Sequence, residues 1–195
     1  TAPTSSSLFG ETISNEFINL SKDNPNLSIL ELGGGDGSLA VSIVSRLIEN
    51  NTLPKCYIIL EISVNLIKIQ KQKIKKYLPD LYKLFKWTST IDHQKFSGLV
   101  IANEFFDALP TERFRIKNNK IESLYIGYKN NKLSYCWKPA NDSFKKELDR
   151  AKNSNQRVEY DNYISELNLN YYKWISLLQK MLISGAIFII DYGYN

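Results

Sequence analysis

Acidic side chains stand at the ends of four short apolar stretches, and this placement is the first sign of a chemical site. The four acids are Glu31, Glu61, Glu104 and Asp191. Neighbouring parallel strands end at the same edge of a sheet, where open α/β folds bind their ligands. A single acid in such a place is often a helix cap or half of a surface ion pair. The recurrence over four stretches instead predicts a binding or catalytic site along this edge.

A glycine-rich segment, residues 33–37, follows the first acid and precedes a helical pattern. Glycines adopt turns that other residues cannot, and they let a ligand approach the backbone amides. Amides at the start of a helix attract an anionic group such as a pyrophosphate or an amino-acid carboxylate. Ser38 occupies the sixth position of the dinucleotide-binding pattern, so the match to a nicotinamide site is weak. Glu61 is placed to accept hydrogen bonds from ribose hydroxyls, which fits both NAD and S-adenosylmethionine.

A parallel sheet would bring these acids and glycines together, and the hydrophobic pattern predicts one. Four stretches are apolar nearly throughout, which is typical of strands buried on both faces. They are residues 27–32, 56–60, 98–102 and 186–190. Helical spacing of apolar residues occurs at 9–20, 39–48, 66–74 and 167–181. Strands that alternate with helices in this way predict a layered α/β domain.

Residues 112–138 break this rhythm and predict an antiparallel β-hairpin insertion. Three β-rich stretches are separated by Asn118-Asn119 and Asn130-Asn131, pairs that favour tight two-residue turns. The polar segment 141–157 that follows is interpreted as a surface loop, with a partly helical segment as the alternative. We treat residues 1–195 as a single domain, and we expect it to be a fragment of a longer chain.

Composition narrows the chemistry that such a site can perform. The chain has 195 residues, 43% hydrophobic and 23% charged, with a formal net charge of +5, which is typical of a globular protein. His93 is the single histidine, so we expect no histidine-rich metal site, and carboxylates, amides or a bound cofactor must do the chemistry. The lysine-rich segment 68–76 is interpreted as a solvated helix face.

The expected compartment is intracellular. Cys56 and Cys136 lie far apart in the sequence and fit reduced thiols better than a disulfide scaffold. No apolar stretch approaches the ~18 residues that a membrane span needs, so we expect no membrane-spanning segment.

Four strings of residues resemble, in this order, the MidA-like methyltransferases. They are Glu-Leu-Gly-Gly-Gly-Asp-Gly at 31–37, Glu-Ile-Ser at 61–63 followed by Gln70, Asn-Glu-Phe-Phe-Asp-Ala-Leu-Pro at 103–110, and Asp-Tyr-Gly-Tyr at 191–194. The third string is the most specific, whereas the glycine loop alone would indicate only a class I methyltransferase. The resemblance extends through nearly the whole chain, although members of the family are larger.

The resemblance implies a Rossmann-like class I methyltransferase sheet with helices on both faces, and S-adenosylmethionine as the cofactor. Residues implied to hold the methionine end of this cofactor are Glu31, Gly33, Gly35 and Gly37. Glu61 would hold the ribose, and Trp87 or Thr88 would border the adenine. Asn103, Glu104 and Asp107 would face the transferable methyl group, with Asn103 also counted among the cofactor-binding residues.

Mitochondrial members of this family serve as complex I assembly factors and methylate arginine on a protein subunit. The resemblance therefore implies an arginine-containing protein partner, in the bacterial cytoplasm or the mitochondrial matrix. Arginine stays protonated below about pH 12, so a carboxylate must hold the guanidinium and receive a proton. Glu104 and Asp107 are the first candidates for this role, and Glu159 and Asp191 are the next.

Three other functions stay open from the residues. A nucleic-acid methyltransferase would explain Asn103 followed by aromatic residues, but Glu104 and Phe105 stand where such enzymes place prolines, so we do not expect nucleic acid as a partner. A non-catalytic assembly module would bind its partner through the hairpin insertion. A nicotinamide-dependent oxidoreductase ranks last. For Asp107, the structural alternative is a cap of the turn before Pro110.

Overall fold

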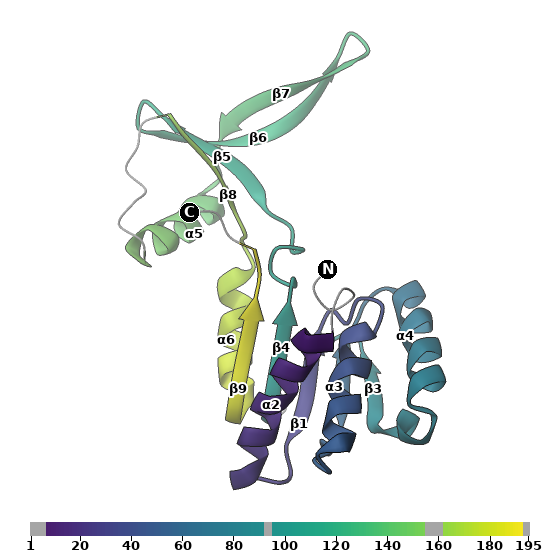
Figure 1. Cartoon of the computed structure of the whole chain (residues 1–195). Helices are drawn as coiled ribbons and strands as arrows, with labels where there is room; N and C mark the ends of the chain where they lie inside the picture. The colour runs from purple at the N-terminus through teal and green to yellow at the C-terminus, as the bar shows by residue number, and fades with distance from the viewer. Residues whose placement is uncertain (1–6, 92–94, 155–161, 193–195) are drawn as a thin grey trace. The chain divides into compact units, whose positions relative to one another are not determined.

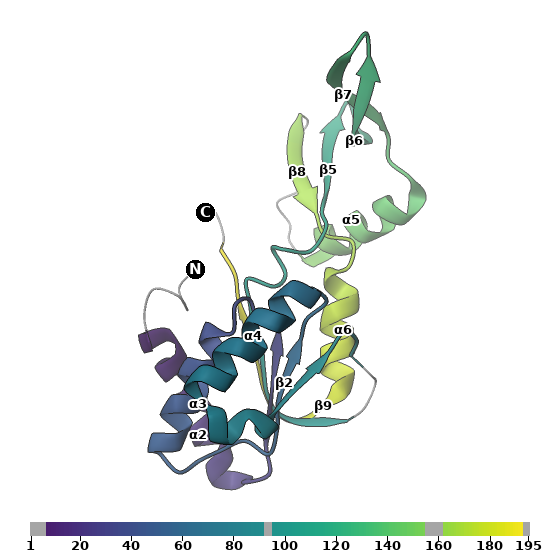
Figure 2. The same cartoon turned by 90° about the vertical axis from the view of Figure 1, so that its right-hand side faces the viewer.

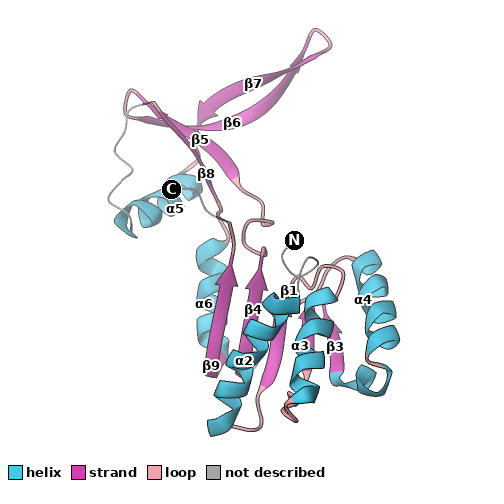
Figure 3. Ribbon diagram, in the orientation of Figure 1, coloured by secondary structure: helices cyan, strands magenta, loops and turns pink. Residues whose placement is uncertain are grey.

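A computed structural model describes residues 7–91, 95–154 and 162–192 of the chain (Figure 1). Contacts divide the chain into two compact units, residues 1–108 with 175–195 and residues 109–174. The elements, coloured by type in Figure 3, are α2 (Ser7–Asp23), β1 (Ser28–Leu32), α3 (Ser38–Glu49), β2 (Tyr57–Leu60), α4 (Val64–Tyr77), the 3-10 helix η1 (Pro79–Leu84), β3 (Phe85–Thr88), β4 (Phe96–Asn103), β5 (Glu112–Lys117), β6 (Lys120–Lys129), β7 (Lys132–Pro139), α5 (Asp142–Ser154), β8 (Tyr163–Leu167), α6 (Tyr171–Met181) and β9 (Leu182–Ile190).

The first unit is built on a five-stranded parallel sheet in the order β3-β2-β1-β4-β9. The four apolar stretches of the sequence form β1, β2, β4 and β9, which confirms the predicted strands. The apolar pattern does not mark β3, because this edge strand buries Phe85 but exposes Lys86. The strand order reverses between β1 and β4, and this is where open α/β sheets form a ligand-binding crevice.

Helices cover both faces of this sheet, as the α/β prediction requires. Figure 2 shows α2, α3 and α4 on one face and α6 on the other. The apolar stripe of α3, residues Leu39, Ile43 and Leu47, is buried in one core cluster with Ile29 and Ile59 of the strands. Burial of this stripe fixes the start of α3, and therefore the glycine loop before it, at the end of β1.

Two glycines allow the central strands to approach closely. Gly98 of β4 pairs with Ser28 of β1 on one side and with Gly185 of β9 on the other. A Cβ on Gly98 would lie only 1.8 Å from the Ser28 carbonyl oxygen, and the φ angle of Gly98 is +147°. A larger residue at this position would push β1 and β4 apart.

The second unit contains an antiparallel sheet in the order β7-β6-β5-β8. Both predicted turns are confirmed: the φ angles of Asn118 and Asn119 are 50° and 58°, and those of Asn130 and Asn131 are 52° and 57°. Two successive left-handed residues form the hairpin turn that matches strand twist. The sheet extends beyond the predicted insertion, because β8 joins it as a fourth strand.

The helix expected over residues 167–181 starts later than the apolar spacing indicates. Leu167 belongs to β8, where it pairs with Glu112, and α6 begins only at Tyr171. Between them, the Asn168 side chain accepts a hydrogen bond from the Asn170 amide at 2.9 Å, which closes a turn. The spacing of Leu167 fitted a helix by coincidence.

The segment interpreted as a surface loop contains the helix α5. The loop interpretation is therefore wrong for these residues, and the partly helical alternative is confirmed. Phe144 and Leu148, one turn apart, are buried in a small core with Phe114, whose ring centroid lies 5.4 Å from that of Phe144. The Asn141 side chain caps the helix by accepting a hydrogen bond from the Phe144 amide at 2.8 Å. Only two apolar residues mark the buried face, and the polar majority of the segment hid them.

Among the residues that the structure describes, no helix is both long enough and apolar enough to span a membrane.

Candidate active site

The glycine loop connects β1 to α3 through three residues with left-handed backbone angles. The φ angles are +71° at Gly33, +50° at Gly35 and +84° at Gly37. The Gly33 amide donates to the Leu60 carbonyl at 2.9 Å and the Gly37 amide to the Gly34 carbonyl at 2.8 Å, so these two amides shape the loop. A Cβ on Gly35 would meet no atom within 4 Å. Gly35 is therefore the point at which a ligand has open access to the loop.

Glu31 lies beneath this loop and is almost completely buried, with 3% of its surface exposed. The Tyr57 hydroxyl donates a hydrogen bond to its Oε2 atom at 2.9 Å. The pKa of Glu31 is raised from 4.5 to about 7. Burial is the main cause, the hydrogen bond from Tyr57 opposes it, and the nearby charges of Asp36 and Glu61 add to it. A ligand cation beside Glu31 would favour its charged form.

Glu61 follows β2, and its carboxylate is held by two donors. The Ser63 amide donates to Oε1 at 2.9 Å and the Gln70 side-chain amide donates to Oε2 at 3.2 Å. The backbone amide of Glu61 also donates to the Thr88 carbonyl at the end of β3 at 2.9 Å. With 7% of its surface exposed, Glu61 is a fixed acceptor at the carboxyl edge of the sheet.

The α4 helix contributes a contact to the glycine loop that the sequence pattern did not indicate. Lys73 donates hydrogen bonds to the Asp36 carboxylate and, at 2.6 Å, to the Ser38 hydroxyl. Burial alone would raise the pKa of Asp36, but the hydrogen bonds from Lys73 and Ser38 outweigh it and lower the pKa. Lys73 therefore faces the loop and does not belong to a purely solvated lysine face.

Trp87 packs against α4 and η1. Its indole N–H donates to Oε1 of Gln70 at 2.9 Å, and the Lys71 Nζ atom lies 5.0 Å from the ring centroid. The Tyr82 ring centroid lies 5.9 Å from that of Trp87. These contacts fix the indole beside the helix that carries Gln70.

Three acids gather at the ends of β4 and β9. Asn103 is the last residue of β4, and the left-handed Glu104 that follows it donates its amide to the Ile190 carbonyl at 2.8 Å. The Asp191 carboxylate accepts hydrogen bonds from the backbone amides of Phe106 and Asp107. Burial and the negative charges of Asp107 and Glu104 raise the pKa of Asp191, and the two backbone hydrogen bonds oppose this shift. The geometry thus brings Glu104, Asp107 and Asp191 together.

The acids lie next to the glycine loop, because β1 and β4 are neighbours in the sheet. A Cβ on Gly33 would lie 3.4 Å from the Phe105 ring. All of the described candidate residues belong to the first unit. Glu159, the remaining candidate, lies outside the described residues. In the part of the chain that is described, no group of three or more His, Cys, Asp or Glu side chains could hold a metal ion.

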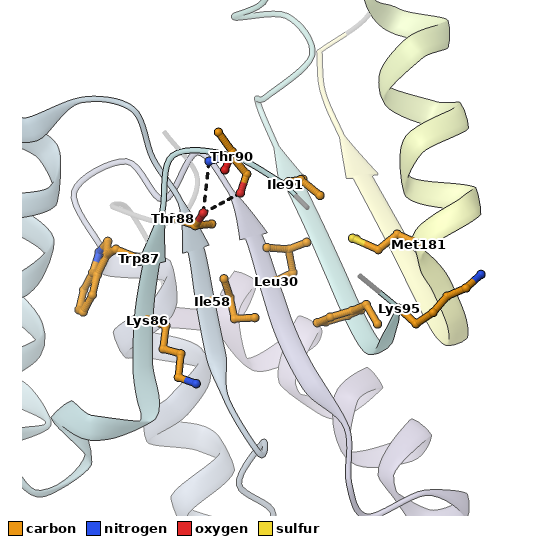
Figure 4. A pocket seen from close by; sticks show the side chains of 10 residues that line it. Leu30, Ile58, Lys86, Trp87, Thr88, Thr90, Ile91, Lys95 and Met181 are labelled. Atoms are coloured by element: carbon orange, nitrogen blue, oxygen red, sulfur yellow. Dashed lines mark hydrogen bonds between the residues drawn. The ribbon is translucent and has the colours of Figure 1, made fainter. Parts of the chain in front are cut away.

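A separate cavity of about 350 Å³ lies over the face of the parallel sheet that α6 covers (Figure 4). Leu30 of β1 and Ile58 of β2 form its floor, and Met181 lies at its side. It includes Trp87 and Thr88 but none of the glycines or acids described above. We therefore do not assign it to the candidate site.

Comparison with solved structures supports the architecture. A Burkholderia thailandensis protein, solved with S-adenosyl-homocysteine bound, matches with a TM-score of 0.85 and 22% sequence identity. The match covers 100% of this chain and 49% of that protein. A native structure of an uncharacterized protein from the same organism matches with the same score and identity over 100% of this chain and 50% of its own. The chain thus spans about half the length of these structures, and they share its fold.

A match to a known family adds to this likeness of fold. No curated protein matches the chain significantly. Residues 8–195, however, match the family described as "Putative S-adenosyl-L-methionine-dependent methyltransferase". The match includes the glycine loop, Glu61 and the acids after β4 and β9. The chain therefore belongs to this family of S-adenosylmethionine-dependent methyltransferases.

Proposed function

We propose that this chain binds S-adenosylmethionine at the glycine loop and takes part in methyl transfer from it. One observation carries the proposal: the loop is open at Gly35 and lies between two buried carboxylates, Glu31 and Glu61. The cofactor has a cationic amino group at its methionine end and two hydroxyls on its ribose. These groups match a buried acid below the loop and a fixed acceptor at the end of the next strand.

Each residue has a distinct role in this proposal. Gly33 and Gly37 give the loop its shape, and Gly35 lets the cofactor approach the backbone. Glu31 faces the methionine amino group, and Glu61 accepts hydrogen bonds from the ribose. The bound cofactor supplies an electrophilic methyl group, and the protein contributes mainly alignment, which can be worth ~7–11 kcal/mol.

We propose arginine on a protein as the methyl acceptor. Support comes from the resemblance to MidA-like enzymes and from the three acids beside the loop. A guanidinium that gains a methyl group must lose a proton, so it needs a carboxylate to hold its charge and another to take the proton. Glu104 and Asp107 suit the first task. Asp191 suits the second, because its raised pKa makes it a better proton acceptor.

The wider assignment rests on the same resemblance. We propose that both units belong to one MidA-type methyltransferase domain and that its target is a subunit of respiratory complex I. The corresponding compartment is the mitochondrial matrix, or the cytoplasm of a bacterium.

Calorimetry with S-adenosylhomocysteine tests the cofactor site in the full-length protein. We expect saturable binding that NAD does not compete for. Glu61→Ala removes the ribose acceptor and should weaken binding by about 1.5–3 kcal/mol. Glu49→Ala is the matched control, because Glu49 is exposed at the end of α3. Absence of binding by the wild-type protein would reject the proposal.

The acceptor is tested by the acids and by mass spectrometry. Glu104→Gln and Asp107→Asn should keep cofactor affinity and reduce turnover. Cells that lack the protein should lose methylated arginine on a partner protein, and the two variants should fail to restore it. Unchanged arginine methylation in those cells would reject an arginine substrate.

A second candidate, a non-catalytic assembly module, is favoured by one feature of the second unit. Residues 120–123 of β6 pair with β5. The rest of β6, residues 124–129, pairs with β7 and forms a two-stranded ribbon. One face of this ribbon exposes Ile126, Tyr128, Leu133 and Tyr135, each by 61–74%. Such ribbons are marginally stable alone in water. Leu133→Glu changes the ribbon, and Glu104→Gln changes the proposed catalytic acids. If the first variant abolishes assembly of the partner and the second supports it fully, the protein acts as an assembly module and not as an enzyme.

A further inference from the structure

Gln70 is a fully buried polar residue of α4, and its side chain connects three parts of the candidate site. Its Nε2 atom donates to the Gly35 carbonyl at 2.8 Å and to Glu61 Oε2 at 3.2 Å. Its Oε1 atom accepts from the Trp87 indole at 2.9 Å. With 0% of its surface exposed, Gln70 has no access to bulk water. These three bonds therefore satisfy an amide that would otherwise be costly to bury.

The partners allow only one orientation of this amide. Rotating it by half a turn would place Oε1 against two oxygen acceptors, on Gly35 and Glu61. It would also direct Nε2 at the indole N–H of Trp87, so all three hydrogen bonds would be lost. A network with a single solution holds its members in fixed positions.

This orientation determines what Glu61 can offer to a ligand. Gln70 and the Ser63 amide donate to different oxygens of the carboxylate. A carboxylate has about four acceptor positions, so roughly two remain, one on each oxygen. Two remaining acceptors with fixed directions suit the two neighbouring hydroxyls of a ribose.

The backbone of α4 also touches the glycine loop at this residue. A Cβ on Gly37 would lie 3.2 Å from the Cα atom of Gln70. One turn further along the same helix, Lys73 donates to Asp36 of the loop. The α4 helix thus holds the loop from Gly35 to Gly37 at two successive positions.

We propose that Gln70 is a positioning residue for the adenosyl group: it orients Glu61 toward the ribose, and its bonds to the Gly35 carbonyl and the Trp87 indole hold its own amide in the orientation that does so. The inference rests on the proposed cofactor site and adds a residue that does not itself need to touch the cofactor. Its effect on binding is exerted through Glu61.

Two variants of the full-length protein remove the network and keep the side-chain size. Gln70→Leu deletes all three hydrogen bonds, and Gln70→Glu replaces the donor with an oxygen facing Glu61. We expect both to bind S-adenosylhomocysteine at least about tenfold more weakly, the loss of one hydrogen bond to a charged group. Gln72→Leu is the matched control on the exposed side of α4, and its affinity should equal that of the wild type. Urea unfolding shows which variants fold. If Gln70→Leu does not fold, the test is made with Gln70→Glu.

Two readouts separate positioning from a general loss of structure. If Gln70 acts through Glu61, the double variant Glu61→Ala/Gln70→Leu should bind no more weakly than Glu61→Ala alone. In a Trp137→Phe/Trp174→Phe background, Trp87 is the single tryptophan, and its emission should shift when Gln70→Leu removes the indole acceptor.

The outcomes distinguish this inference from the proposed function. Wild-type affinity in the folded Gln70 variants would overturn the inference while leaving the cofactor site intact. Fully additive losses in the double variant would overturn it as well, since Gln70 would then act independently of Glu61. No binding by the wild type would reject the proposed function and the inference together. An unshifted Trp87 emission would show that Gln70 does not hold the indole, and the inference would fail while the proposed function stands.

Discussion

Glu31→Gln removes a buried charge and keeps the shape of the side chain, so it measures what burial of this acid does to stability. The glutamine Oε1 can still accept the hydrogen bond from Tyr57. The folded pKa of Glu31 is about 7, against 4.5 for the free side chain. At 1.36 kcal/mol for each unit, ionising Glu31 in the folded protein costs roughly 3 kcal/mol.

The sign of the effect follows from the raised pKa. Between about pH 4.5 and pH 7 the folded protein keeps a proton that the unfolded chain has released, so stability falls as pH rises through this window and then levels off. Glu31→Gln cannot ionise and lacks this decline. The variant should therefore gain up to roughly 3 kcal/mol on the wild type between about pH 5 and pH 8.

Urea unfolding of both proteins at a series of pH values measures this difference. The subtraction cancels other groups that titrate in the same window. Glu49→Gln, at an exposed site, should follow the wild type throughout. If Glu31→Gln and the wild type show the same dependence on pH, Glu31 is not the buried, desolvated acid described above.

Three further predictions address the loop and the sheet. Affinity for S-adenosylhomocysteine should rise about tenfold from pH 6 to pH 8 as Glu31 ionises, and calorimetry of Glu31→Gln should show no such rise. Gly98→Ala should destabilise the protein by more than ~3 kcal/mol in urea unfolding because of the clash with β1. Gly127→Ala, where a Cβ would make only ordinary contacts at 3.4 Å or more, should change stability far less, and equal losses would contradict the close approach. Lys73→Met should lower stability by no more than ~1 kcal/mol, because its partner Asp36 is partly exposed, and this loss should shrink in high salt; a loss that salt does not change would exclude an ionic contribution.

The strands and turns were the most predictable part of the fold. The strands β1, β2 and β4 are buried on both faces, and a sequence records such burial as an uninterrupted apolar run. The strand β9 has a similar apolar run but lies at the edge of the sheet and is only partly buried, so the prediction of its burial on both faces is wrong. The turns at Asn118 and Asn130 were equally visible, since few residues tolerate two left-handed angles in a row. By contrast, α5 buries one narrow face in a polar segment, and this pattern is too weak to recognise in the sequence. The strand β8 is short and only partly buried, and its last residue, Leu167, also fits a helical spacing.

The candidate site divides in the same way. The glycines and the acids at the strand ends were apparent because their types and their order along the chain are unusual. Gln70 was recognised only as part of the second string that resembles the family, without a role, and Lys73 was interpreted as part of a solvated helix face. The sequence of this lysine-rich helix does not show which of its sides meets the glycine loop. The amides of Gly33 and Gly37 were expected to face the cofactor, but their hydrogen bonds to Leu60 and Gly34 appear only once the loop has folded.

The amino-acid order by itself determined which backbone angles are possible, which stretches are buried and which side chains stand at the strand ends. Those properties depend on residue type and on near neighbours along the chain. Tertiary structure alone decided the pKa of Glu31, the orientation of Glu61 and the contact between α4 and the loop. Each of these depends on desolvation or on a hydrogen bond between residues distant in the sequence, and such effects exist only after the sheet and its helices have packed.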